Sequence, residues 1–245
     1  MVKKPYVKKF CEVSIFKVWI VDGNYVRKNI DEEFTNYGQH SRFNFIPENE
    51  FWIDKTRNPG EEKFYIDSMI VMHRLMSEGI NKNKAVRIAD SIEKRERAKT
   101  ELMRKEIKLK NNKQKLIDSI HIKILKNYSN DKIKIWIVNG EAVRDIFFLD
   151  FVEGGHGYVY PFIPKDEVWI DNDVEPSEIK FVLLHELHER NLMKKGWCYD
   201  VDTPSNLKTG KIKKGAHPDS SRVEYYCRFH PEETNKKIMT EIRKV

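Results

Sequence analysis

The sequence has few cysteines and no long apolar run. Its three cysteines, Cys11, Cys198 and Cys227, are scattered and form no CxxC pair, which argues against a disulfide framework and favours a reducing compartment. No segment approaches about eighteen uninterrupted apolar residues, and the charged N-terminus lacks the apolar region of a signal peptide. We therefore expect a cytoplasmic protein with no membrane span.

Motifs that identify nucleotide-binding or nucleic-acid-binding proteins are also missing. The sequence contains no P-loop, no zinc-finger spacing and no RNP signature. It does contain 40% hydrophobic residues among 245, enough for a substantial core, and its net charge is +7. That charge favours anionic partners, but it is also typical of a lysine-rich solvated surface.

The sequence consists of two similar halves. A shift of 117 residues superposes "KVWIVDGNYVR", which begins at residue 17, on "KIWIVNGEAVR", with seven identities in eleven positions. The same shift superposes "FIPENEFWID" (45–54) on "FIPKDEVWID" (162–171) without a gap. Agreement over that length indicates a duplicated domain.

Each copy predicts the same series of elements. "KVWIVDG" and "KIWIVNG" are β-rich and end in Asp-Gly or Asn-Gly, so residues 25–27 and 142–144 are expected to return as hairpin strands. A glycine-containing loop leads to a second strand, "EFWID" or "EVWID", and then to a helix that ends at Gly79 or Gly196. A second helix closes each copy.

The second helices superpose only after a larger shift. Residues 84–97 match residues 215–228 at a shift of 131, so the second copy carries 14 extra residues in a loop rich in Gly, Pro, Ser and Lys. We predict an α+β protein, a tandem duplication of a small β-sheet plus two-helix domain, joined by a long charged helix. Its parts are a degenerate N-terminal repeat (1–110), a linker helix region (111–132) and a C-terminal repeat (133–245).

Two histidines and two glutamates distinguish the second copy. They lie in "FVLLHELHERNLM" (181–193), an apolar helical stretch in which uncompensated charge is costly. The first copy has small or apolar residues there: the counterparts of His185, Glu186, His188 and Glu189 are Ser68, Met69, Val71 and Met72. We interpret the cluster as a removable site on a common scaffold.

The helical spacing suits one bound cation. Residues three and four apart are neighbours on a helix, so His185, His188 and Glu189 project from one side, whereas Glu186 lies about 100° round. His217, on the second helix, completes a three-ligand set with an open position for water. We predict that His185, Glu189 and His217 bind zinc or another divalent transition metal, with His188 as an alternative ligand.

Two further residues have open roles. Glu224 lies two helical turns beyond His217 and is a ligand, an outer-sphere acceptor or a purely structural residue, because the first copy keeps Glu93 there. His156, in "EGGHGY", is a candidate site residue on a loop or an ordinary surface histidine, and the first copy has Gln39 in its place.

"VWID" followed by "FVLLHELHE" resembles the strand and His-Glu-x-x-His helix of zincin metallopeptidases, over residues 167–193. By this resemblance, His185 matches the first zinc ligand and Glu186 the general base. Glu189 stands at the position of the second ligand, where a carboxylate also ligates zinc. The resemblance implies a zincin-like metal-dependent hydrolase, with peptidases among the options. Because the first copy lacks the polar cluster, we expect the N-terminal repeat to be inactive.

Other functions fit the same residues. The cluster is also compatible with a structural ion, or with a metal-free buried His/Glu network, in a non-enzymatic interaction module. Basic residues of the linker helix and of the 201–215 loop suit contact with nucleic-acid phosphates. Interleaved glutamates, however, form the intrahelical pairs that any exposed helix shows.

Overall fold

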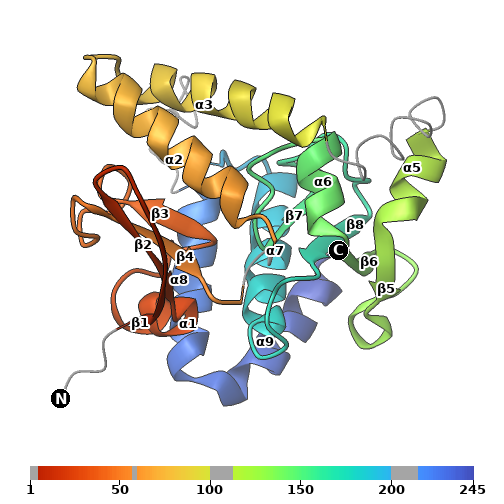
Figure 1. Cartoon of the computed structure of the whole chain (residues 1–245). Coiled ribbons are helices and arrows are strands. Elements are labelled where there is room, and N and C mark those ends of the chain that lie inside the picture. The colour runs from red at the N-terminus through yellow and green to blue at the C-terminus, as the bar shows by residue number, and fades with distance from the viewer. Residues whose placement is uncertain (1–4, 57–59, 100–112, 200–214) are drawn as a thin grey trace, which may run out of the picture. The chain divides into compact units, whose positions relative to one another are not determined.

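Two small mixed sheets and the helices beside them make up the described part of the chain. The structure, a computed structural model, describes residues 5–56, 60–99, 113–199 and 215–245. Within these ranges it is α+β, with eight α-helices and two four-stranded sheets (Figure 1). In chain order the elements are β1 (Tyr6–Val13), β2 (Phe16–Val21), α1 (Gly23–Asn29), β3 (Tyr37–Gln39), β4 (Glu50–Asp54), α2 (Glu62–Ser77), α3 (Lys82–Arg97), α5 (Lys113–Ile120), β5 (His121–Ile124), a 3-10 turn (Lys126–Tyr128), β6 (Lys134–Val138), α6 (Gly140–Ile146), β7 (Gly154–His156), β8 (Glu167–Asp171), α7 (Ile179–Lys194), α8 (Ala216–Phe229) and α9 (Pro231–Arg243).

The two sheets have the same strand order and the same register. Their orders are β1-β2-β4-β3 and β5-β6-β8-β7, and in each the central pair is parallel while both edge strands are antiparallel to their neighbours. Lys17 pairs with Glu50 in the first sheet, and Lys134 pairs with Glu167 in the second. Because parallel neighbours need a crossover connection, the chain leaves each sheet between β2 and β4 or between β6 and β8.

The prediction of hairpin strands at residues 25–27 and 142–144 is wrong, because these residues form helices α1 and α6. The Asp-Gly of the first copy begins a helix instead of a β-turn. The Asp22 carboxylate accepts a hydrogen bond from the backbone N–H of Tyr25 at 3.1 Å, as a helix N-cap does. The actual antiparallel neighbour of β2 is β1, which precedes it.

A glycine at the start of α1 and of α6 allows close approach to the sheet. A Cβ on Gly23 would overlap the carboxylate of Asp54, and a Cβ on Gly140 would overlap that of Asp171. Both aspartates end a central parallel strand, β4 or β8. The repeated "WID" and "DG" or "NG" segments of the sequence are therefore packing partners in the fold.

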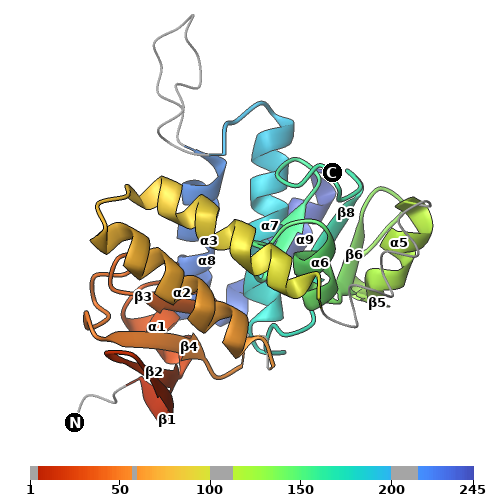
Figure 2. The same cartoon turned by 45° about the horizontal axis from the view of Figure 1, so that its top comes forward.

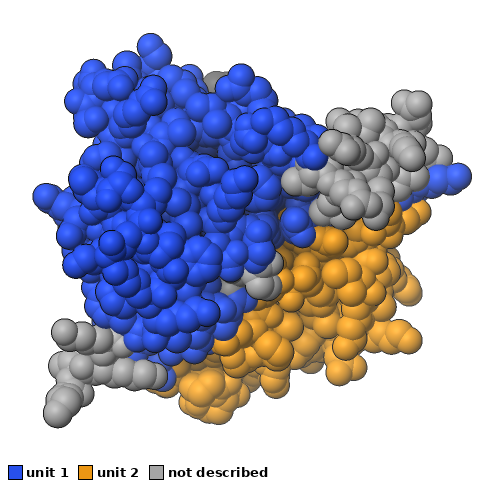
Figure 3. Space-filling view, in the orientation of Figure 1, with its two compact units in different colours: residues 1–116, 141–150 blue, residues 117–140, 151–245 orange. Residues whose placement is uncertain are grey.

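Two compact units interleave along the chain. Unit 1 comprises residues 1–116 and 141–150, and unit 2 comprises residues 117–140 and 151–245 (Figure 3). Residues 121–124, which the sequence analysis assigns to the linker, form β5, the edge strand paired with β6. Of the expected linker helix, residues 113–120 are helical as α5, and residues 111–112 lie outside the described residues.

Buried ion pairs in unit 1 explain why residues 141–150 belong to it. The Arg144 guanidinium bonds both carboxylate oxygens of Glu61, with Nε and Nη2 at 3.0 and 2.5 Å. Arg97 of α3 bonds Asp145 at 3.1 Å, Glu61 at 2.7 Å and Glu93 at 3.0 Å. Charge neutralisation inside the unit offsets the cost of burying these groups.

Unit 2 contains a matching network beneath α7 and α8. Arg228 bonds Glu178 at 2.5 Å and Glu224 at 2.6 Å, and its guanidinium lies 4.9 Å from the centre of the Phe181 ring. These residues hold the start of α7 against the end of α8. The network matters for the site because Glu224 also reaches a histidine of α7.

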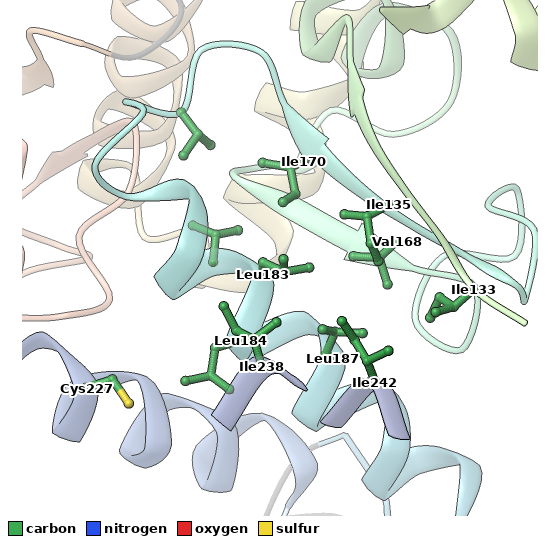
Figure 4. Packing of buried hydrophobic residues seen from close by; sticks show 12 residues of the cluster. Ile133, Ile135, Val168, Ile170, Leu183, Leu184, Leu187, Cys227, Ile238 and Ile242 are labelled. Atoms are coloured by element: carbon green, nitrogen blue, oxygen red, sulfur yellow. The ribbon is translucent and has the colours of Figure 1, made fainter. Parts of the chain in front are cut away.

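The core of unit 2 lies between its sheet and helices α7, α8 and α9. Leu183, Leu184 and Leu187 of α7 are fully buried against Ile135, Val168 and Ile170 of the sheet and Ile238 of α9 (Figure 4). Helix α9 is an element that the sequence analysis did not anticipate. Among the described residues, no helix combines the length and apolarity that crossing a bilayer requires.

Candidate metal centre

Helix α7 carries its polar cluster on the side that the apolar face leaves free. Its apolar residues anchor one side in the core, and the chain turns at Gly196, whose φ of +84° suits the glycine that follows a helix. His185 and Glu189, four residues apart, therefore project together toward α8. Both side chains are buried, at 10% and 3% exposure.

His217 of α8 lies against these two residues. Its Nδ1 lies 3.1 Å from His185 Nε2 and 2.9 Å from Glu189 Oε2, and His185 Nε2 lies 3.4 Å from the same carboxylate oxygen. Three ligand-type atoms from two helices thus form a small triangle. His217 keeps 28% exposure of its side chain, and the Tyr199 ring stacks on its imidazole with the centroids 4.9 Å apart.

The triangle has the dimensions of one face of a zinc coordination sphere. Zn–N and Zn–O distances of about 2.0–2.1 Å in tetrahedral geometry place neighbouring ligand atoms about 3.3 Å apart. The three distances here, 2.9, 3.1 and 3.4 Å, scatter around that value. The spacing of the three atoms is therefore compatible with one shared ion.

Glu224 supports His185 from behind. Its Oε2 accepts a hydrogen bond from His185 Nδ1 at 2.8 Å, which leaves His185 Nε2 directed at the triangle. A carboxylate on the far nitrogen of a ligating histidine sets the tautomer and the ring orientation. Of the roles left open for Glu224, the geometry matches the outer-sphere acceptor, and the bonds to Arg228 add a structural role.

His156 supports Glu189 in the same way. It is fully buried on β7 rather than on a surface loop, and its Nε2 lies 3.0 Å from Glu189 Oε1. Its Nδ1 accepts the backbone N–H of Tyr158 at 3.2 Å, so a neutral ring carries its proton on Nε2 and donates it to Glu189. Burial lowers the pKa of His156 more than the nearby Glu189 raises it.

A second group of donor atoms therefore suits metal binding less well. A ring nitrogen of His156 and carboxylate oxygens of Glu186 and Glu189 also lie within 4.8 Å of one another. Because His156 Nε2 donates to Glu189 while its Nδ1 accepts a hydrogen bond from Tyr158, no nitrogen lone pair of that ring is free for an ion. We assign His156 to the orientation of Glu189.

Glu186 lies beside the triangle, one position along α7 from His185. Burial, and next the charge of Glu189, raise its pKa to about 8, although His185 and His217 oppose the shift. Gly154 of β7 makes room for it, because a Cβ on that glycine would lie 3.2 Å from Glu186 Cγ. A carboxyl group with a pKa near neutrality suits proton transfer.

The electrostatics of the triangle favour a positive charge at its centre. Burial by itself lowers the pKa of His185, but hydrogen bonds to Glu189 and Glu224 outweigh it and hold that pKa well above the usual histidine range. Burial likewise raises the pKa of Glu189, yet His156, His185 and His217 hold it well below its usual range. Without a metal, a proton on His185 supplies that positive charge.

His188 lies elsewhere, outside both groups of donor atoms that could hold an ion among the described residues. Its Nδ1 lies 2.9 Å from Glu241 of α9, and its Nε2 lies 3.2 Å from Asp219 of α8. Each nitrogen thus bonds a different helix. His188 therefore links α7 to α8 and α9.

Arg190 ties the segment after β7 to α7. Its Nε and Nη2 donate to the backbone oxygen of Lys165 at 3.2 and 2.6 Å, and its guanidinium lies 5.7 Å from the centre of the Tyr158 ring. Since Tyr158 also donates to His156, these contacts keep His156 in place. At a shift of 117 residues in the sequence, His73 and Ser41 stand at the positions of Arg190 and Tyr158.

The structure bears little on the basic residues proposed to contact nucleic acid. Most of them fall in residues 100–112 and 200–214, outside the described residues. Of those described, Arg97 is fully buried among Glu61, Glu93 and Asp145. Arg97 is therefore part of the unit 1 core and not of a phosphate-binding surface.

Comparison with protein-family models, with curated proteins and with solved structures finds no match for this chain. Function is therefore inferred from the site itself.

Proposed function

We propose that His185, Glu189 and His217 bind one divalent metal ion, zinc in the first instance, and that this centre serves a zincin-like hydrolase. One observation carries the proposal: three ligand atoms from α7 and α8 form a triangle with sides of 2.9, 3.1 and 3.4 Å. Support comes from Glu224 and His156, which orient two of the three ligands.

A divalent ion held by His185, Glu189 and His217 would supply a bound water with a pKa lowered toward neutrality. Glu186, a partly buried carboxyl next to His185 in the sequence, would in its ionised form accept the proton of that water. Glu224 holds the proton on Nδ1 of His185 throughout, so His185 Nε2 stays available as a ligand.

We further propose that unit 1 and unit 2 arose by duplication and that unit 1 lacks the site. The shared strand order, the shared register and the two matching arginine networks support this interpretation. In unit 1 the carboxylate corresponding to Glu224 is Glu93, and its partner is Ser68, the counterpart of His185. The supporting residue is thus kept where the ligand is absent.

Metal content tests the proposal most directly. Protein purified without added metal is analysed by elemental mass spectrometry before and after exposure to zinc, as wild type and as His185→Ala, His217→Ala and His188→Gln. The expected result is one equivalent of metal in wild type and in His188→Gln, and its loss in the other two variants. Circular dichroism confirms that each variant is folded.

The alternatives predict different outcomes. A metal-free His/Glu network predicts no stoichiometric metal in wild type even after zinc is offered, and that result refutes the proposal. A structural ion predicts metal in wild type and a lower free energy of unfolding once it is removed. The hydrolase predicts that Glu186→Gln keeps the metal and stability while losing hydrolysis of a fluorogenic peptide mixture.

A further inference from the structure

Unit 1 has a groove between helices α2 and α3. It forms a cavity of about 260 Å³ along the two helices, which run side by side (Figures 1 and 2). Phe64, Ile70 and Ile92 supply apolar walls, and Asp67 and Glu96 supply carboxylates. The volume lies below the roughly 300–1,000 Å³ of typical small-molecule pockets, so it suits a few side chains of a protein partner.

The matching place in unit 2 is occupied by a helix. Ile238 and Ile242 of α9 are buried with Leu184 and Leu187 of α7 and with Cys227 of α8 (Figure 4). The registers of 117 and 131 residues pair Leu184, Leu187 and Cys227 with Asp67, Ile70 and Glu96. All three of these unit 1 residues line the cavity, so the groove lies where a helix packs in unit 2.

Burial differs between the two places. Leu187 is fully buried beneath α9, whereas its counterpart Ile70 keeps partial exposure. Ile92 of α3 is also partly exposed at the groove. Binding of a partner at that position in unit 1 would therefore bury further solvent-accessible apolar area.

The charge of the groove indicates the chemistry of its partner. Leu184 and Cys227 face α9 in unit 2, but their counterparts Asp67 and Glu96 are acidic, and both keep contact with solvent. Glu96 already pairs with Lys99 at 2.6 Å, whereas Asp67 is exposed, so an apolar partner that buried Asp67 without a counter-ion would lose binding energy. A partner with lysine or arginine beside its apolar side chains avoids that loss.

We propose that the groove between α2 and α3 docks a basic amphipathic helix of a partner protein. Its aliphatic side chains, one helical turn apart, pack on Ile70 and Ile92, and a basic side chain pairs with Asp67. In this mode of recognition, side chains three and four residues apart on one face of the helix contact the groove. The interaction is independent of the metal proposed for unit 2.

A peptide derived from α9 tests the proposal on the full chain. The probe is a fluorescein-labelled peptide of residues 231–243 in which Glu232, Glu233 and Glu241 are replaced by lysine, so Ile238 and Ile242 are retained. Fluorescence anisotropy at low salt measures its binding. We expect saturable binding below about 100 μM, and at least about tenfold weaker binding to the Asp67→Lys/Glu96→Lys variant.

Two controls separate the groove from charge in general. The Glu48→Lys/Glu78→Lys variant makes the same charge change at exposed positions outside the groove and should bind like wild type. A second peptide with serine in place of both isoleucines should bind at least about tenfold more weakly. No binding, equal weakening in both variants, or equal affinity of the two peptides would overturn the proposal.

Discussion

Glu241 of α9 makes the stability of this protein depend on pH in a way that one substitution tests. Its carboxylate accepts hydrogen bonds from His188 at 2.9 Å, from Asn191 at 3.0 Å and from Lys244 at 2.5 Å, and its side chain is 7% exposed. Burial raises the pKa of Glu241, but these three hydrogen bonds outweigh it and lower the pKa to about 2.

The magnitude follows from the difference between the folded and unfolded pKa values. An unfolded glutamate titrates near 4.3, so a shift of about 2.3 units corresponds to about 3 kcal/mol at pH 7. Because the folded pKa lies below the unfolded one, this stabilisation is fully present above about pH 5 and is lost as the pH falls toward 2. By the same relation about 1.4 kcal/mol is left at pH 3.

The assay compares wild type with Glu241→Gln by urea unfolding in EDTA at pH 7 and pH 3. The difference in free energy of unfolding should shrink from about 3 to about 1.4 kcal/mol, and other acid-sensitive groups cancel because both proteins carry them. Glu233→Gln, at a side chain 42% exposed, should stay within about 0.5 kcal/mol of wild type. A difference that is the same at both pH values would refute the role of charge at Glu241.

Three further substitutions test the site, the core and the close approach of α6 to the sheet. Glu224→Gln should lower zinc affinity about 10- to 100-fold in competition with a chromophoric chelator, and unchanged affinity would mean that it does not orient His185. Leu187→Ala should reduce the free energy of unfolding by about 2–5 kcal/mol because the side chain is fully buried, whereas Tyr225→Ala, 45% exposed, should change it little. Gly140→Ala forces a Cβ into a strand carboxylate and should cost about 1–3 kcal/mol, so an unchanged melting temperature would contradict that packing.

Local pattern was sufficient for about half of the described helices and strands. Alternating apolar residues marked β2, β4, β6 and β8, and the helical period marked α2, α3, α7 and α8. The stops at Gly79 and Gly196 are confirmed by their φ values of +85° and +84°. These features depend on residues that are close to each other in the chain. The local sequence is therefore enough to predict them.

Prediction from local pattern was wrong where the same residue pair is typical of two different local structures. Aspartate and asparagine before glycine suit both a hairpin turn and a helix N-cap, so the starts of α1 and α6 were predicted as turns. The choice depends on packing that the local sequence does not contain: Gly23 lies against Asp54, and Gly140 lies against Asp171.

The candidate site divides in the same way. The sequence by itself determined that His185 and Glu189 share one side of a helix, because the helical period is a local property. Only the tertiary structure decided that His217 closes the triangle, that buried His156 orients Glu189, and that His188 turns to other helices. These contacts join residues 28 to 53 positions apart, and their geometry depends on how the core packs α7 against its neighbours.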